Sequence, residues 1–212
     1  MIKHIIWDWN GTLFNDVNLC VELGNELLRS RGLPEMTIER YREIFSLPVI
    51  RYYEKAGFDF TIESFEKLGR EWMDNYESRK YECSLYNEVP DVLKNISLLG
   101  INQYVLSAYS HNDLVSIIEH YEIIEFFSNI KGLHHIYADS KLHLGLELIE
   151  EINSHPDTIL IIGDTHHDFD IAKELRVKSV LFSGGHQSEG KLNKFGVPVI
   201  SSHKEIIEYL NA

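Results

Sequence analysis

The sequence predicts an α/β fold in which a doubly wound parallel sheet carries an inserted all-helical subdomain. Short apolar runs alternate along most of the chain with stretches whose apolar residues recur at helical spacing. This alternation is typical of a parallel sheet that is covered by helices on both faces. The exception is the segment from Val17 to Cys83, which contains helical patterns and no convincing strand. We therefore expect a helical insertion after the first strand.

The predicted strands are short apolar runs. The first, Ile2–Trp7, leads directly into Asp8 and then Gly11, as expected of a buried parallel strand that ends in a turn. Comparable runs occur at Tyr104–Leu106, Ile159–Ile162, Val180–Phe182 and Val197–Ile200. Apolar stripes at helical spacing lie between most of them, formed by Leu114, Ile117, Ile118 and Tyr121, by Leu142, Leu146, Ile149 and Ile152, and by Ile171, Ala172 and Leu175.

Four helices are expected in the insertion. They are marked by two longer stripes and two shorter pieces: Val17, Cys20, Leu23 and Leu27; Ile62, Phe65, Leu68, Trp72 and Tyr76; Ile38–Phe45; and Val49–Ala56. One long helical crossover packed on the sheet is the alternative, but roughly sixty residues exceed what a crossover needs. The predicted division is an α/β core of residues 1–15 and 86–212 and a helical subdomain of residues 16–85, with hinges near Phe14–Asp16 and Ser84–Val89.

The composition restricts the class of protein. Of the 212 residues 44 % are hydrophobic, so we expect a packed core and not a disordered chain. The chain has 20 Lys and Arg against 33 Asp and Glu, which gives a formal net charge of −13. This acid excess argues against a non-specific nucleic-acid binder and against docking on an anionic membrane, because both need fields of Lys and Arg.

The sequence also bears on location. No stretch approaches about 18 uninterrupted apolar residues, and the N-terminus lacks the apolar length and cleavage site of a signal peptide. Cys20 and Cys83 do not make a disulfide framework, and this cysteine usage fits a reducing compartment, with one disulfide left open. We therefore expect a cytoplasmic protein.

Polar residues that can carry chemistry follow the predicted strands, where ligands bind in open parallel sheets. They are Asp8, Asn10, Gly11 and Thr12 after the first strand, Ser107 and Ala108 after the second, Asp164 and Asp168 after Ile162, and Asp139, Ser140 and Lys141 beyond the short Ser128–Lys131 stretch. Carboxylates hold Mg²⁺, and an Asp can carry a phosphoryl group. Lysine, hydroxyl and N–H groups stabilise phosphate oxygens. The set suits phosphoryl transfer.

Four segments resemble the motifs of the haloacid dehalogenase-like phosphohydrolases. IIWDWNGTLFND is similar to the first motif, Asp-x-Asp-Gly-Thr; YVLSA supplies Ser107 of the second, SKLHLG supplies Lys141 of the third, and IIGDTHHD is similar to the fourth, Gly-Asp-x-x-x-Asp. Their order and spacing match over nearly the whole chain, and the insertion resembles the helical cap of the phosphoglycolate-phosphatase-like branch. The resemblance implies a Rossmannoid core, a cap at residues 16–85, and a Mg²⁺-dependent phosphatase of a small, phosphoglycolate-like monoester.

The resemblance assigns roles to four residues. It makes Asp8 the nucleophile and a Mg²⁺ ligand, and Asp164 and Asp168 further metal ligands. Asp168 can also act as a helix N-cap, and the two roles are compatible. The resemblance pairs Lys141 with the phosphate and Asp8. A cation at a helix N-terminus opposes the helix dipole, so a lysine at this position needs another reason.

Substrate-binding candidates lie beside these residues. Gly11, Thr12, Ser107 and Ala108 are expected to contact phosphate, with a simple turn cap as the alternative for Thr12. Arg51, in the cap segment, is a candidate for binding a substrate anion, and a solvated surface arginine is the alternative.

Histidines stand near the same motifs. His166 and His167 lie between the two metal aspartates, and His186 follows a pair of glycines after a strand. Imidazole suits transition metals, whereas the carboxylates favour a Mg²⁺ site. A part for these histidines in the site is left open.

Asn10 departs from the family pattern, which has aspartate at this position. In the family this aspartate is the general acid and base, and its backbone carbonyl binds the metal. We therefore expect Asn10 to leave Mg²⁺ binding intact and to slow proton transfer, which is typically worth about 10²–10⁴-fold.

Other functions and partners follow from this departure. The alternatives are a phospho-ligand-binding or partner-binding protein with little turnover, and a phosphonate-cleaving relative that uses Lys55 or Lys67 of the cap. The expected partner is a small phosphorylated metabolite, with no nucleic acid and no membrane. The chain is expected to be a monomer or weak homodimer.

Overall fold

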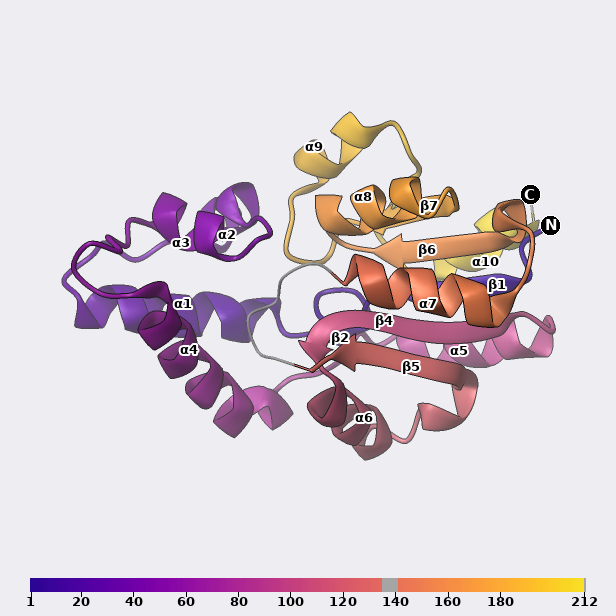
Figure 1. The fold of residues 1–212 in the computed structure, drawn as a ribbon, viewed down its shortest axis with the longest axis horizontal. Coiled ribbons are helices and arrows are strands. Elements are labelled where there is room, and N and C mark those ends of the chain that lie inside the picture. The colour runs from indigo at the N-terminus through magenta and orange to yellow at the C-terminus, as the bar shows by residue number, and fades with distance from the viewer. Residues whose placement is uncertain (135–140, 212) are drawn as a thin grey trace.

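A six-stranded parallel sheet forms the centre of the protein in the computed structural model, which describes residues 1–134 and 141–211. The strands lie in the order β5-β4-β1-β6-β7-β8 (Figure 1). Their bounds are β1 His4–Trp7, β4 Asn102–Ser110, β5 Phe127–Leu133, β6 Ile159–Gly163, β7 Lys178–Phe182 and β8 Val199–Ile200. Since β4, β1 and β6 are neighbours, the residues at their carboxyl ends lie at one edge of the sheet.

Helices cover both faces of this sheet. They are α5 Val89–Leu98, α6 His111–His120, α7 Leu142–Ile152, α8 His166–Glu174, α9 Glu189–Leu192 and α10 Lys204–Asn211, with 3-10 turns at Lys80–Glu82, Ile124–Phe126, Pro156–Thr158 and Asn193–Phe195. Figure 1 shows α7 in front of the sheet, with α5 and α10 behind it. None of the described helices combines the length and apolar character needed to span a bilayer.

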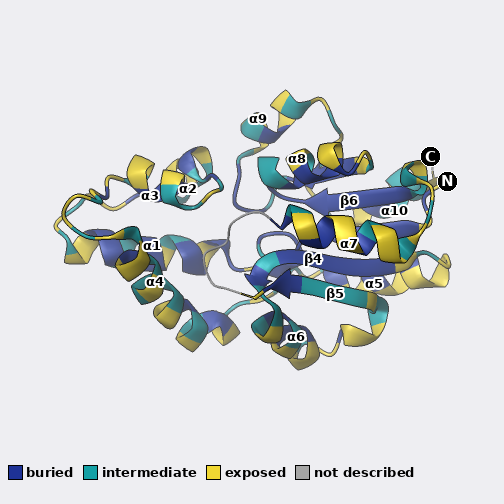
Figure 2. Ribbon diagram, in the orientation of Figure 1, coloured by how far each residue is buried: buried dark blue, intermediate teal, exposed yellow. Residues whose placement is uncertain are grey.

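The strand β1 shows how the two faces are packed. Successive side chains of a strand point to opposite faces. Ile6 accordingly belongs to a core cluster with Leu148 of α7 and Ile171 of α8, whereas Ile5 belongs to a second cluster with Ile206 of α10. Figure 2 shows the inner strands β4 and β6 buried and the edge strand β5 mostly half-buried, with helices whose outer faces are exposed.

The predicted fold class, a doubly wound parallel α/β sheet, is confirmed. One strand differs from the sequence-based expectation, because the Ser128–Lys131 stretch lies within β5. β5 is one of the two edge strands and pairs only with β4, and most of its residues are half-buried. An edge strand of this kind lacks the continuous apolar run that marks the inner strands. The candidates Asp139 and Ser140 lie outside the described residues.

The insertion contains four helices: α1 Val17–Ser30, α2 Ile38–Ile44, α3 Ile50–Ala56 and α4 Phe65–Arg79. They lie together beyond the carboxyl edge of the sheet (Figure 1). The helix α4 begins one turn later than its apolar stripe, because the Ser64 hydroxyl accepts a hydrogen bond from the Lys67 N–H (3.3 Å). Ile62 therefore precedes the helix and is 84 % exposed.

Two chain segments connect the sheet to the helical insertion. β2 (Phe14–Asn15) pairs antiparallel with β3 (Ser84–Leu85). These are the segments in which hinges were expected. The division into a core of residues 1–15 and 86–212 and a cap of residues 16–85 stays a prediction. Cys20 and Cys83 are both free thiols.

Candidate active site

Asp8 lies at the carboxyl end of β1, in the middle of the sheet. The register of β1 places Trp7 opposite Val105 on one side and Ile162 on the other. The Asp8 N–H donates to the Ile162 carbonyl at 2.8 Å, so the pairing continues one residue past the strand. The side chain of Asp8 therefore starts from a rigid, buried position.

The turn after β1 needs glycine at position 11. Gly11 has φ of +71°, and a Cβ at this position would lie 2.5 Å from Oδ2 of Asp164. Only glycine adopts this conformation without strain and leaves room for the neighbouring carboxylate. The turn brings Oγ1 of Thr12 to 3.1 Å from Oδ1 of Asp164 and 3.3 Å from Oδ2 of Asp8. The close approach of these groups thus depends on one small residue.

Lys141 stands at the N-terminal cap of α7 and reaches the same place. Its Nζ donates to Oδ1 of Asp8 at 2.5 Å, to Oδ1 of Asp168 at 2.8 Å and to the Leu106 carbonyl at 3.0 Å. The lysine is 3 % exposed, and these contacts match the three donors of an ammonium group. A buried cation with two carboxylate partners accounts for a lysine at this unfavourable end of a helix.

Asp164 and Asp168 come from the loop after β6 and the first turn of α8. Asp164 accepts from the His186 N–H at 2.5 Å. Asp168 accepts from the N–H and the hydroxyl of Thr165, at 3.1 and 2.8 Å, in a capping box at the start of α8. Its other oxygen binds Lys141. The N-cap of α8 is therefore Thr165 and not Asp168, which is its capping-box partner three residues later and also has a place in the site.

Three carboxylates converge in the site. One oxygen from each of Asp8, Asp164 and Asp168 lies within 4.8 Å of the other two. Burial raises the pKa of Asp8 to about 6 against the opposing charge of Lys141. Burial raises the pKa of Asp164 to about 8, and the charges of Asp8 and Asp168 add to this rise. The single ammonium of Lys141 thus does not offset three buried carboxylates, and their oxygen donors fit a hard divalent cation such as Mg²⁺.

Ser107 and Ala108 belong to β4, the neighbour of β1, and both line the cavity above Asp8. Ser107 is 1 % exposed, and its Oγ accepts from the Tyr109 N–H at 3.1 Å. Its hydroxyl hydrogen remains for another acceptor. These residues lie where the sequence predicted a phosphate-binding edge.

Asn10 is held in one orientation by two residues at its amide nitrogen. Its Nδ2 donates to Oδ2 of Asp16 at 2.8 Å and to the Tyr76 hydroxyl at 2.7 Å, and Tyr76 donates to the same Asp16 oxygen at 2.8 Å. A carboxylate only accepts hydrogen bonds, so the amide must present its nitrogen to Asp16. Because Tyr76 belongs to α4, Asn10 also connects the turn after β1 to the helical insertion.

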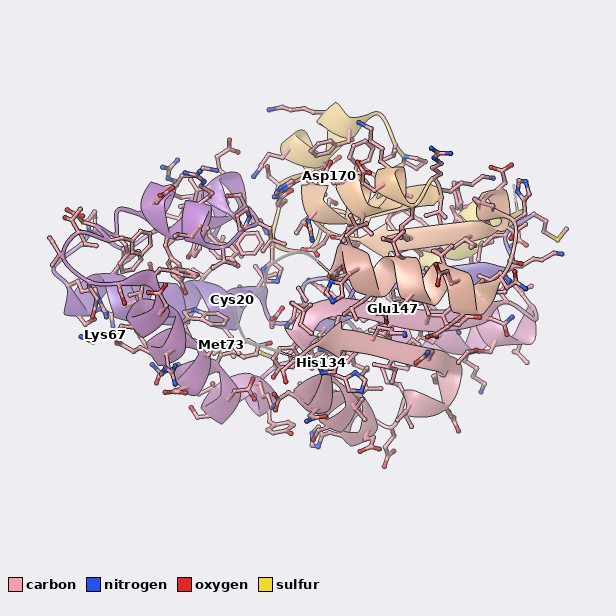
Figure 3. All side chains as sticks on the ribbon, in the orientation of Figure 1. Cys20, Lys67, Met73, His134, Glu147 and Asp170 are labelled. Carbon is pink, nitrogen blue, oxygen red and sulfur yellow. The ribbon has the colours of Figure 1, made fainter. Side chains whose placement is uncertain are left out.

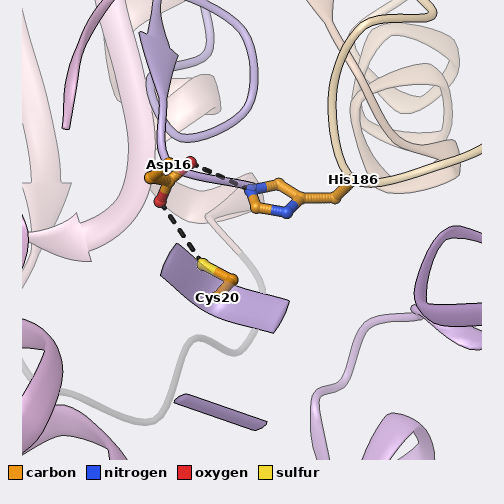
Figure 4. Close-up of side chains that lie close together, drawn as sticks. All are labelled: Asp16, Cys20 and His186. Atoms are coloured by element: carbon orange, nitrogen blue, oxygen red, sulfur yellow. Dashed lines mark hydrogen bonds and ion pairs between the residues drawn. The ribbon is translucent and has the colours of Figure 1, made fainter. Parts of the chain in front are cut away.

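Asp16, Cys20 and His186 form a second buried cluster (Figure 4). Nε2 of His186 lies 3.4 Å from Oδ1 of Asp16, and the Cys20 thiol donates to Oδ2 of Asp16 at 3.6 Å. Burial disfavours the imidazolium, but Asp16 outweighs this effect and raises the pKa of His186 to about 9. The Tyr41 hydroxyl contacts the other ring nitrogen of His186 at 2.8 Å. Asp16 already accepts from several protein donors, so the cluster is a hydrogen-bonded ion pair.

A cavity of about 160 Å³ lies between these residues and the helical insertion. His167 lines it, and among the described residues its Nε2 has no hydrogen-bond partner. Burial and the charge of Lys141 lower the pKa of His167, so this ring is neutral. The ring of His166 instead contacts the Gln187 side chain at 2.8 Å.

Arg51 is not brought to the site. Its side chain is 66 % exposed and pairs with Glu54 at 3.0 Å. The expectation that Arg51 binds a substrate anion is therefore not supported, and the solvated alternative describes it. Its short helix α3 turns that side chain to solvent, while Tyr52 and Tyr53 of the same helix are buried.

Sequence reasoning missed Asp16 and Tyr76 as parts of the site. An aspartate directly before a helix suggests an N-cap, but the Asp16 side chain makes no capping hydrogen bond. Tyr76 was expected only as part of an apolar helical stripe in the insertion. A weak signal was available: Asp16 stands within the first motif, close to the position at which a carboxylate is missing.

The fold and the site define a class of α/β enzymes in which an aspartate and a lysine meet below a helical cap. Residues 5–182 match the family described as haloacid dehalogenase-like hydrolase. The chain therefore belongs to the haloacid dehalogenase-like hydrolases, and the resemblance seen in its motifs is confirmed.

Several known proteins are similar to this chain over its whole length. The N-acetylmuramic acid 6-phosphate phosphatase of Pseudomonas aeruginosa is 22 % identical over 216 residues, which cover 99 % of this chain and 95 % of that protein. A haloacid dehalogenase-like hydrolase from Streptococcus pneumoniae has a similar fold, with a TM-score of 0.83, 19 % identity and coverage of 99 and 98 %. Protein tyrosine kinase A of Mycobacterium tuberculosis gives a TM-score of 0.82, with 20 % identity and coverage of 100 and 99 %.

Proposed function

We propose that this hydrolase is a Mg²⁺-dependent phosphatase that removes the phosphoryl group of a small monoester through an aspartyl-phosphate on Asp8. The observation that carries the proposal is the convergence of Asp8, Asp164 and Asp168 within 4.8 Å, directly beside the buried ammonium of Lys141. A phosphatase among the relatives, which acts on a sugar-acid phosphate by its name, supports the same reaction class.

The residues of the site divide the work of the first step. Lys141 holds Oδ1 of Asp8 at 2.5 Å, which leaves Oδ2 to attack phosphorus. The new bond joins Oδ2 to phosphorus, the bond from phosphorus to the ester oxygen breaks, and the departing oxygen takes its proton from water, because the Asn10 amide has none to give. A Mg²⁺ ion held by Asp8, Asp164, Asp168 and the Asn10 carbonyl would neutralise charge on the phosphate oxygens.

Phosphate binding is assigned to groups at the same edge of the sheet. Ser107, through its hydroxyl hydrogen, and the backbone of Ala108 would donate to the oxygens of the phosphoryl group. The N–H groups of Gly11 and Thr12 already donate to the carbonyls of Phe14 and Trp9, so these two residues contribute by shaping the turn that the phosphate approaches. The lysine ammonium adds positive charge beside them. These contacts hold the phosphorus in line with the attacking oxygen, which is the main requirement of phosphoryl transfer.

Asn10 supports a slow second step. An amide neither gives nor takes a proton at neutral pH, so Asn10 cannot activate the water that hydrolyses the aspartyl-phosphate. The amide oxygen can still orient this water, since the nitrogen is occupied by Asp16 and Tyr76. Loss of positioned proton transfer slows a step by about 10²–10⁴-fold. We therefore propose that the phosphorylated enzyme accumulates, and that a phospho-binding role with little turnover is the second candidate.

The phosphonate-cleaving alternative lacks support. That chemistry requires a cap lysine at the substrate, but Lys55 is exposed and contacts the Ser46 hydroxyl at 3.1 Å. Lys67 is 73 % exposed beside Glu63, at the end of the cap far from the sheet in Figure 3. A cytoplasmic location, a small phosphorylated metabolite as partner, and a monomer or weak homodimer are part of the proposal.

Rapid-quench measurement of phosphate release tests this function. Metabolite monoesters are mixed with the full chain in the presence of Mg²⁺ or of EDTA, and the Asp8→Asn variant is measured in parallel as the control. We expect a burst of alcohol release close to one per enzyme, followed by slow turnover, and a mass increase of one phosphoryl group on the peptide that contains Asp8. Release that is equal in Asp8→Asn, or is unaffected by EDTA, contradicts the proposal.

A further inference from the structure

The wall of the cavity that faces the carboxylates is apolar and comes from the cap. It is formed by Phe45, Leu47, Val49, Tyr53, Trp72 and Met73. We call this surface the cap wall. Trp72 stacks on Tyr76 with ring centroids 5.0 Å apart and an angle of 16° between the rings, which makes part of the wall a flat aromatic surface. Figure 3 shows Met73 on the side of the cap that is turned toward the core.

The charges around the cavity leave no spare cation in the described part of the chain. The charged groups that line it are four carboxylates and two cations: Asp8, Asp16, Asp164, Asp168, Lys141 and His186. Lys141 is bonded to two of the carboxylates, and His186 is paired with a third. Residues 135–140 add neither lysine nor arginine, since their sequence is HIYADS.

Basic residues of the cap near this cavity are engaged elsewhere. Arg42 donates to the Gly184 and Gly185 carbonyls at 2.7 and 2.9 Å. Lys55 contacts the Ser46 hydroxyl, and Arg51 is turned to solvent. None of these three lines the cavity. An anionic group on the organic part of a substrate would therefore meet the cap wall without a cationic partner.

The size of the cavity limits the organic group. A dry cavity of about 150 Å³ in a protein core is enough to hold benzene. The cavity here, at about 160 Å³, must also hold the phosphoryl group, so it has room for one ring or a chain of a few carbons. A flat, apolar group of this size can pack on Trp72 and the residues beside it.

We propose that the enzyme acts on phosphate monoesters of small, uncharged, apolar alcohols, and that the cap wall rejects esters that carry a second anionic group, such as phosphoglycolate. This inference rests on the proposed phosphatase function. Burying a carboxylate against apolar side chains without a partner is strongly unfavourable, whereas an apolar group gains from the same burial. The substrate class is therefore set by the cap, and the reaction by the core.

The test compares two esters that differ in one charge. Benzyl phosphate and 4-carboxybenzyl phosphate have similar leaving groups, so proton transfer affects both alike. With the full chain and Mg²⁺, we expect kcat/KM for benzyl phosphate to exceed that for the carboxylated ester by at least about 100-fold. Phosphoglycolate should be as poor as the carboxylated ester.

A cation placed in the cap wall should reduce this preference. Met73→Lys is chosen because Met73 lines the cavity and is only half-buried, so the lysine can be accommodated. We expect Met73→Lys to lower the ratio of kcat/KM for benzyl phosphate to kcat/KM for 4-carboxybenzyl phosphate by at least about 10-fold. Asn75→Lys adds the same charge at an exposed position of α4 and should leave the ratio unchanged.

The outcomes separate the two proposals. Asp8-dependent release with an equal or better rate for the carboxylated ester overturns the substrate class and leaves the phosphatase function standing. A Met73→Lys ratio equal to that of the unmodified chain also overturns it. Release from neither ester, nor from any other monoester, with Asp8→Asn indistinguishable, removes both proposals together.

Discussion

Exchanging the amide and carboxylate at positions 10 and 16 tests the account of Asn10 directly. Asn10→Asp alone restores the aspartate typical of the family, but it replaces an amide nitrogen that lies 2.8 Å from Oδ2 of Asp16. Two carboxylate oxygens would then face each other at that distance. The double variant, which combines Asn10→Asp with Asp16→Asn, moves the charge from one position to the other and keeps the number of carboxylates constant.

The magnitude follows from the distance. At an effective dielectric constant of about 20, two unit charges 2.8 Å apart repel each other by about 6 kcal/mol. This corresponds to about four pKa units. In the single variant, the two carboxyl groups at positions 10 and 16 would therefore share one proton at neutral pH, as two close carboxylates do. Little of the base form is available to activate water.

The double variant avoids this repulsion and keeps the hydrogen bonds among positions 10, 16 and 76. The amide nitrogen introduced at position 16 can donate to the carboxylate introduced at position 10. The Tyr76 hydroxyl, which donates to Asp16 in the natural chain, can donate to the same new carboxylate in the double variant. We expect the double variant to raise the steady-state rate at pH 7 by about 100-fold over the natural chain. The steady-state rate of the single variant should rise by less than about 10-fold at pH 7 and should reach its maximum at higher pH. Asp16→Asn alone should bring no gain.

The assay is rapid-quench release of alcohol and phosphate between pH 5 and 9. It separates the burst, which reports attack by Asp8, from the slow phase, which reports hydrolysis. Equal steady-state rates for the single and double variants at pH 7 refute the proposed repulsion by Asp16. Failure of both variants to shorten the slow phase refutes the role given to Asn10.

Three further predictions follow. Mg²⁺ binding requires Asp8 and Asp164 to lose their protons, and their pKa values are about 6 and 8. The affinity for Mg²⁺ should therefore rise with pH, and calorimetry should show binding about 100-fold weaker at pH 6 than at pH 9. Lys141→Met removes the cation between two buried carboxylates. Chemical denaturation of the metal-free protein should show that the free energy of unfolding falls by about 3–5 kcal/mol. The rate of the burst phase should fall by at least about 100-fold. Arg42→Ala breaks two hydrogen bonds between α2 and the loop after β7, so hydrogen exchange should show less protection of the α2 amides. Arg40→Ala, at an exposed position of the same helix, should leave this protection unchanged.

The position of most proposed catalytic groups could be predicted from the sequence because it depends on the strands of the sheet. Asp8, Ser107 and Asp164 follow or end apolar runs, and parallel strands present their carboxyl ends at one edge. Lys141 could be recognised because its charge opposes the dipole of the helix that it precedes. In the structure, each of these side chains lines the same cavity.

The remaining features depend on how the cap lies against the core, which no local pattern encodes. The contact of Tyr76 with Asp16 joins residues 60 positions apart. The exposure of Arg51 depends on which side of a short helix packs inward. The edge strand β5 was missed for a related reason, because its single strand neighbour leaves it half-buried and without a continuous apolar run.

The charge balance of the cavity sets an order of binding. A phosphate dianion that enters the metal-free site meets four carboxyl groups, of which Asp164 with its pKa of about 8 is mostly protonated at neutral pH, and two cations that are already paired with carboxylates. The net charge of −13 on the chain adds a repulsive background, although salt screens it beyond about 8 Å. Attraction must therefore come from a cation bound at the three carboxylates before the substrate arrives. Substrate affinity should then depend on the Mg²⁺ concentration, while Mg²⁺ affinity without substrate should follow the protonation of Asp8 and Asp164 alone.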